Sequence, residues 1–190
     1  MPRKVLLRQY HLYQVRNVSN AEPVASLQTA LSDFDGTLIG LFKGLLGLPN
    51  TDFFVLVLST GNRIKLPENF EVVAQHDLSA TLRPQHHQPF TQDGVYVFRF
   101  WTLPGDHVDE VVRLSGLAWE TFETDFATEV KALFRQTNAE TEETAVLITW
   151  YQDFSTWEES RRPAIDAVRY FSARAKLINR ALPIATRLVL

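Results

Sequence analysis

Apolar and polar residues alternate along several short stretches of the chain, which is typical of β-strands. Leu6 to Leu12 and Val95 to Leu103 distribute apolar and aromatic side chains over two faces. Phe53 to Leu58 and Ala145 to Tyr151 are almost continuously apolar, as expected for buried strands. Ile184 to Leu190 is expected to be the last strand. The pattern therefore predicts a protein with a large β-sheet content.

Other apolar residues recur every three or four positions, which is the spacing along one face of a helix. One such stripe follows Pro23, a residue tolerated in the first helical turn, and contains Leu27, Leu31, Phe34, Leu38, Leu41 and Phe42. A second stripe contains Trp119, Phe122, Phe126, Val130, Leu133 and Phe134. We therefore expect a long helix through each stripe, and shorter helices at Phe154 to Glu159 and Ile165 to Asn179.

The same order of elements occurs twice, so the chain is expected to contain an internal repeat. LLRQYHL and VFRFWTL share a frame that aligns Arg8 with Arg99 and Tyr10 with Trp101. DFDGTLIGLFK is echoed later by DFATEVKALFR, and FFVLVLST by AVLITWYQ. Each half then consists of strand, helix, strand and strand, which is a ferredoxin-like α+β unit.

The expected fold class is α+β, with two tandem ferredoxin-like units packed sheet to sheet as a single-chain α/β barrel. Residues 1–83 would form the N-terminal half and residues 95–190 the C-terminal half. Residues 84–94 contain prolines and a glycine without any apolar period, and are expected to be the linker. Packing the sheets together is favoured because each covers the other's apolar face.

LLRQYHL and VFRFWTL resemble the opening strand of NIPSNAP-type domains, which belong to the dimeric α/β-barrel group. AWETFETDFATEVKALFR and LITWYQDFSTWEESRR are similar to the following helix and strand of bacterial members. The resemblance implies an α/β barrel and supplies no catalytic residues. Some members of the wider group bind haem or carry out cofactor-independent monooxygenation, and others only bind small molecules.

The sequence DFDGTL resembles the first motif of haloacid-dehalogenase-like phosphatases. In such an enzyme Asp33 would attack the phosphoester, Asp35 would transfer the proton, and magnesium would neutralise charge. That nucleophile has to follow a buried strand, and Gln28 to Ser32 is not an apolar strand. Ala127 replaces the second Asp in the repeat. We therefore favour a structural helix here over a phosphatase site.

Composition narrows the classes of partner and cofactor. The net charge is −3 and the Lys and Arg residues are scattered, which argues against nucleic acid. The absence of Cys excludes a thiol nucleophile and a Cys-ligated metal. Haem needs an axial ligand, for which His11 and His76 are the candidates on predicted strands. We expect no metal site and no obligatory cofactor.

The longest apolar stretch, Leu38 to Leu48, is interrupted by Lys43 and is shorter than the roughly 20 residues of a membrane-spanning helix. We therefore expect no membrane span and a cytoplasmic location.

The preferred candidate site combines arginines and aromatic residues of the two opening strands. Strand alternation would place them on the face between the two sheets, where they could form an apolar pocket for a small anionic or aromatic ligand. The predicted ligand-binding residues are Arg8, Tyr10, Arg99, Trp101 and Trp150. The alternative is that the arginines pair with carboxylates such as Asp77 or Asp153 and seal the barrel.

The function expected from these features is binding of a small molecule between the sheets, or service as an interaction module, with a homodimer as a further option. The alternatives are a monooxygenase-like enzyme, cofactor-independent or haem-dependent, and the magnesium-dependent phosphatase.

Overall fold

The computed structural model describes residues 8–19, 22–137, 141–163 and 165–189 of the 190-residue chain. The first half contains β1 (Gln9–Asn17), α1 (Pro23–Ser32), β2 (Thr37–Leu46), β3 (Asp52–Ser59) and β4 (Phe70–Ala80). The second half contains β5 (Val95–Pro104), η1 (Gly105–His107), α2 (Val108–Asp125), β6 (Thr128–Gln136), β7 (Glu142–Tyr151), α3 (Phe154–Glu159), α4 (Ile165–Ala175) and β8 (Arg180–Leu188).

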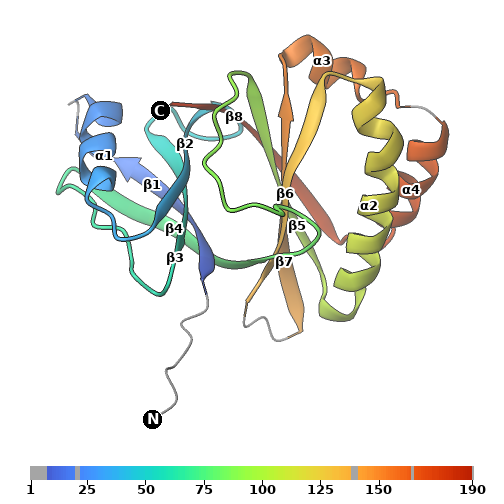
Figure 1. Ribbon diagram of the computed structural model, residues 1–190, viewed down its shortest axis with the longest axis horizontal. Coiled ribbons are helices and arrows are strands. Elements are labelled where there is room, and N and C mark those ends of the chain that lie inside the picture. The colour runs from blue at the N-terminus through green and yellow to red at the C-terminus, as the bar shows by residue number, and fades with distance from the viewer. Residues whose placement is uncertain (1–7, 20–21, 138–140, 164, 190) are drawn as a thin grey trace.

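The strands form one closed antiparallel barrel in the order β1-β3-β2-β8-β5-β7-β6-β4. Each half contributes four neighbouring strands in the ferredoxin-like order, and the halves join through the edge pairs β2–β8 and β4–β6. Figure 1 shows α1 outside the first half of the barrel, and α2 and α4 outside the second half. The fold class predicted from the sequence is confirmed.

The barrel interior is filled with side chains. One buried apolar cluster contains residues from all eight strands, which places it inside the closed sheet. Its centre is aromatic, because the ring of Phe98 lies 5.0 Å from those of both Phe42 and Phe54. Phe98 comes from the second half and the other two rings from the first. The interior therefore stabilises both halves at once.

Residues 81–94 connect β4 to β5 and cross one end of the barrel. Phe90 stacks on Tyr96 with ring centroids 5.8 Å apart, and its backbone N–H donates to the carbonyl of Ile39 at 2.8 Å. Nδ1 of His87 lies 2.6 Å from the hydroxyl oxygen of Tyr10. The connection therefore closes this end of the barrel over interior side chains.

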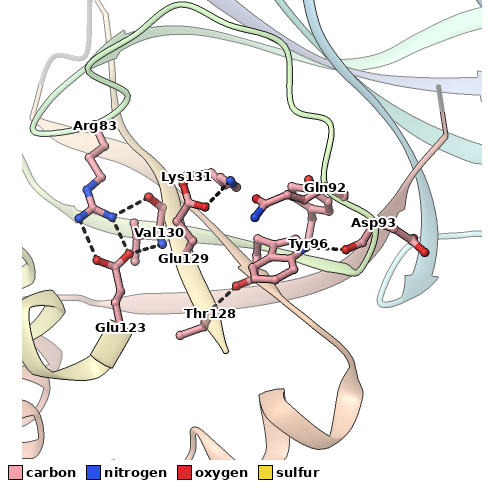
Figure 2. A network of polar contacts seen from close by, with 10 residues as sticks. Arg83, Gln92, Asp93, Tyr96, Glu123, Thr128, Glu129, Val130 and Lys131 are labelled. Atoms are coloured by element: carbon pink, nitrogen blue, oxygen red, sulfur yellow. Dashed lines mark hydrogen bonds and ion pairs between the residues drawn. The ribbon is translucent and has the colours of Figure 1, made fainter. Parts of the chain in front are cut away.

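Polar contacts tie this connection to the second half at both of its ends (Figure 2). The Arg83 guanidinium donates to both carboxylate oxygens of Glu123 on α2, and to the carbonyl of Val130 at 2.9 Å. At the other end, the Tyr96 hydroxyl donates to the carbonyl of Gln92 at 2.8 Å. These contacts hold the connection across the barrel end.

The two long predicted helices are wrong in their second parts. α1 ends at Ser32 and α2 at Asp125, and Phe34 and Phe126 lie in the connections that follow. The later residues of the two stripes are in strands β2 and β6, namely Leu38, Leu41 and Phe42, and Val130, Leu133 and Phe134. Both strands have a register shift, between Leu38 and Gly40 and between Val130 and Ala132. Such a β-bulge places residues three apart on one face, as a helix does.

The other predicted elements occur close to the expected positions. The predicted helix at Phe154–Glu159 is α3, and the predicted strand in the last residues is β8. Residues 6 and 7 of the predicted first strand, and residue 190 of the last, lie outside the described residues. None of the helices in the described part of the chain is long and apolar enough to cross a membrane.

Candidate functional site

The structure does not bring the predicted binding residues together. Arg8 is exposed and precedes β1, and Tyr10 points into the barrel, where its ring lies 4.7 Å from that of Phe134. Arg99 and Trp101 lie on the opposite face of the sheet, towards the helices. The expected common face is therefore wrong.

The error comes from the alignment of the two opening strands. Tyr10 pairs with Leu58 on β3, and Tyr96 pairs with Trp150, the counterpart of Leu58 on β7. The structural counterpart of Tyr10 is thus Tyr96 and not Trp101. The two alignments differ by an odd number of positions, and an odd shift moves every side chain of a strand to the other face.

Trp150 lies at the barrel end that residues 81–94 cross. Its indole N–H donates to the carbonyl of Asp93 at 2.9 Å, and its ring packs against the interior cluster. The contacts of Trp150 therefore hold the connection between the halves.

The DFDGTL segment follows α1 and its last two residues already belong to β2, so the helix expected here is wrong. Asp33 is the C-terminal cap of this helix, and Asp35 accepts a hydrogen bond from the side chain of Asn62 at 2.7 Å. Both carboxylates line a groove in which every lining residue is at least partly exposed. Asp33 follows a helix and not a buried strand, so it lacks the position that the phosphatase nucleophile requires. Among the described residues, no three His, Asp or Glu side chains are grouped to hold a metal ion.

A cavity of about 420 Å³ lies between the sheet of the second half and helices α2, α3 and α4. Its volume is within the usual range for small-molecule sites, roughly 300–1,000 Å³. Seven of its lining residues are buried, unlike those of the groove beside α1. Its aromatic lining residues are Trp119, Phe122, Tyr151, Trp157 and Phe171.

Two arginines face this cavity from opposite sides. Arg99, on β5, donates to the hydroxyl oxygen of Tyr151 at 2.9 Å and to that of Thr149 at 3.2 Å. Arg174, on α4, donates to the hydroxyl oxygen of Ser115 at 3.0 Å, and its Cζ lies 4.5 Å from the ring centroid of Trp101. Arg174 is therefore held between a hydroxyl group and an aromatic face.

The charge of Arg174 is held in a partly desolvated place. Burial and the nearby charge of Arg99 lower the pKa of Arg174 to about 9, so the guanidinium still carries its charge at neutral pH. Among the described residues, no carboxylate lies within ion-pair distance of either arginine. Asp77 contacts His11 instead, and Asp153 caps α3 by accepting from the Thr156 N–H. The cavity therefore has an uncompensated positive side.

Sequence reasoning missed Arg174 as a site residue, although its spacing carries a signal. Ala167, Phe171 and Arg174 follow the i, i+4, i+7 pattern of one helix face. Ala167 is fully buried, so the same face directs Arg174 towards the sheet. An arginine on the apolar stripe of a predicted helix is the pattern that would have identified it.

A smaller pocket of about 230 Å³ lies where Gln14, His76, Phe100 and Thr102 meet, on interior-facing positions of the barrel. Burial lowers the pKa of His76 in spite of the nearby Asp77 carboxylate, which favours the neutral imidazole. This volume lies below the usual range for small-molecule sites. The larger cavity has no His among its lining residues. Neither place therefore combines haem's usual axial ligand with sufficient room.

No protein-family model matches the sequence, and no curated protein matches it either. Solved structures do match the fold. An anthrone oxidase-like protein superposes with a TM-score of 0.65 at 8% identity, over 96% of this chain and 92% of that one. A candidate monooxygenase from Fusobacterium nucleatum gives a TM-score of 0.61 at 10% identity, over 97% and 93% of the two chains.

A ferredoxin-fold protein from Listeria monocytogenes, related to antibiotic biosynthesis monooxygenases, gives a TM-score of 0.55 at 10% identity, with 97% of each chain covered. At this level of identity the likeness concerns the fold alone. It identifies the chain as a ferredoxin-like α/β barrel that spans nearly the whole length of these neighbours.

Proposed function

We propose that the protein binds a small organic molecule in the cavity between the second half of the barrel and helices α2 to α4. The observation that carries this proposal is the cavity itself, which combines five aromatic side chains with a few polar groups. Ligand sites typically have this composition, because apolar walls supply affinity and a few polar groups orient the ligand.

This location replaces the space between the two sheets as the favoured binding place. The interior is filled by residues from all eight strands, and Phe90 covers the interior rings at one end. The smaller pocket inside the barrel, with about 230 Å³, lies below the usual volume range of small-molecule sites. The outer cavity is thus the better supported site.

A monooxygenase-like activity is the second candidate. Two of the fold neighbours are an anthrone oxidase-like protein and a candidate monooxygenase, and the cavity has the aromatic lining that an aromatic substrate would contact. We also propose kinship with NIPSNAP-type proteins, which rests on the sequence motifs of the two halves. Oxygen consumption upon addition of a phenol would support the enzymatic role. Binding of the phenol without oxygen uptake would support a role in binding alone.

The binding proposal can be tested by isothermal titration calorimetry with 2-naphthylmethanol, an uncharged bicyclic aromatic alcohol. We expect saturable binding with one site per chain. Ser172→Phe, which places a ring into the cavity from α4, should abolish the heat of binding. Ala175→Phe is the matched control, because Ala175 is exposed on the same helix and does not line the cavity.

Two results would contradict the binding proposal. Equal binding by wild type and Ser172→Phe would place the ligand elsewhere. An absence of binding for this alcohol and for related aromatic acids would favour the interaction-module alternative.

A further inference from the structure

We propose that the ligand of this cavity is an organic anion, whose carboxylate or phosphate group binds between Arg99 and Arg174 while its apolar body contacts the aromatic walls. This inference rests on the proposed function, since it specifies the chemical class of the ligand bound at the same site.

The first argument concerns the hydrogen-bond partners of the two arginines. Buried or half-buried guanidinium groups are normally paired with carboxylates, because an uncompensated charge is costly to remove from water. Here the protein partners of Arg99 and Arg174 are hydroxyl oxygens of Thr149, Tyr151 and Ser115. Neutral acceptors orient a guanidinium without cancelling its charge.

The second argument is that the arginines act on each other. Both arginines line the same cavity, and the charge of Arg99 contributes to lowering the pKa of Arg174. Two like charges facing one space repel each other. A bound anion would replace this repulsion by two attractive interactions, so the charges that line the cavity favour an anionic ligand.

The third argument is the remaining donor capacity around the cavity. Each of the two guanidinium groups has five N–H donors, of which the protein hydrogen bonds described above use only part. The indole N–H of Trp157 is buried and has no hydrogen-bond partner among the described residues. A third arginine, Arg161, is exposed and also lines the cavity. The described residues that line the site therefore offer hydrogen-bond donors and include no carboxylate.

The aromatic walls specify the remainder of the ligand. Trp119 and Phe122 are buried on α2, and Phe171 faces them from α4 with its ring 5.4 Å from that of Phe122. A flat bicyclic or tricyclic body matches such walls and the volume of about 420 Å³. Inorganic anions alone would leave these walls uncovered.

The test compares three ligands with the same body, namely 2-naphthoate, 2-naphthyl phosphate and 2-naphthylmethanol, by calorimetry on the wild-type protein. Charge-assisted hydrogen bonds predict that at least one anion binds about 10- to 100-fold more tightly than the alcohol. The carboxylate and phosphate ligands show which anionic group the arginines prefer. This comparison needs no variant, so it remains valid if substitutions impair folding.

Variants locate the anion. Arg174→Gln and Arg99→Gln should each weaken binding of the preferred anion about tenfold or more, and change the affinity for the alcohol by less than about threefold. Arg169→Gln is the matched control, because Arg169 is on α4 and does not line the cavity. Arg174→Lys should restore part of the affinity, because it restores the charge without the planar fork.

The outcomes are distinguishable. Equal affinities for anions and alcohol would overturn the anion proposal and leave the binding function in place. Anion binding that both arginine variants retain in full would also overturn it. If none of the three ligands binds, the proposed function fails and the anion proposal fails with it.

Discussion

The two halves of the barrel have the same strand order and different outer faces. Three polar residues that line the cavity, Arg99, Thr149 and Tyr151, have uncharged counterparts on β1 and β3. Tyr13, Val57 and Ser59 stand in the first half where Arg99, Thr149 and Tyr151 stand in the second. The first half therefore builds the same strand pairing with other side chains at these three positions.

The helices that cover the outer face of the sheet also differ between the two halves. In the first half, α1 has 10 residues and is accompanied by the irregular segment that contains Ile64 and Leu66. In the second half, α2 has 18 residues and packs beside α4. Two helices over one sheet leave a lined space between them and the strands. The strand order common to both halves forms the barrel, and the cavity lies where the second half has the further helices α3 and α4.

The largest expected effect is on the interior core, to which both halves contribute side chains. Phe98→Ala removes a fully buried ring that contacts Phe42 and Phe54 of the other half. We expect a loss of about 3–5 kcal/mol in the free energy of unfolding. Urea unfolding should still show one transition by both fluorescence and circular dichroism, because the interior cluster spans both halves. Phe154→Ala is the control, since Phe154 is partly exposed, and should cost about 1 kcal/mol or less. Two separate transitions would contradict the shared core.

The second-largest expected effect is on stability at acid pH and depends on Asp52, a residue of the first half. Burial raises the pKa of Asp52, but hydrogen bonds from Arg16, Gln14 and Thr51 outweigh it and lower the pKa below the ordinary 3.8. A lowered folded-state pKa stabilises the protein fully above the unfolded value, and this contribution is lost as the pH falls through the folded value.

In the first half Arg16 pairs with Asp52 across β1 and β3. The residues at the corresponding positions of the second half are Thr102 and Thr144, which do not titrate in this range. Urea unfolding midpoints measured between about pH 7 and pH 3 should therefore fall steeply below about pH 4 in the wild type. Asp52→Asn should reduce this acid sensitivity. A variant with an unchanged pH profile would show that Asp52 does not contribute.

The smallest expected effect comes from exchanging one residue between the two halves, at the position of Thr149 and Val57. Thr149→Val installs the residue of the first half, Val57, and removes one acceptor of Arg99, which retains Tyr151. We expect a cost of about 0.5–1.5 kcal/mol in stability and a weakening of 2-naphthoate binding that is smaller than for Arg99→Gln. The reciprocal Val57→Thr buries a hydroxyl group in the first half and should leave binding unchanged. Equal effects of both changes on affinity would contradict a site confined to the second half.

The sequence predicted the fold class because strand alternation, buried strands and the repeat all concern the barrel itself. The prediction was wrong where the apolar residues of a strand have the spacing of a helix face. In β2 and β6, Leu38 and Leu41, like Val130 and Leu133, lie three apart on the outer face because a bulge intervenes. The Asp35–Gly36 pair, a common turn signal, marks the connection where the first helix has already ended.

The site was less accessible to sequence reasoning than the fold. Arg99 was identified as a candidate on a frame match with Arg8, yet its facing depends on register, which an odd shift in alignment reverses. Its neighbours in the cavity come from β7, α2, α3 and α4. Their convergence is a property of packing between distant segments, and local periodicity carries no information about it.

The edge pairs β2–β8 and β4–β6 close the barrel within one polypeptide. A barrel assembled from two separate chains would dissociate upon dilution, because its stability depends on protein concentration. Here ring closure is unimolecular, so the same folded fraction is expected at nanomolar and millimolar protein. Each substitution also occurs once per barrel instead of twice. A single mutation can therefore change one outer face while the other retains its original residues, a freedom that a symmetric pair of chains lacks.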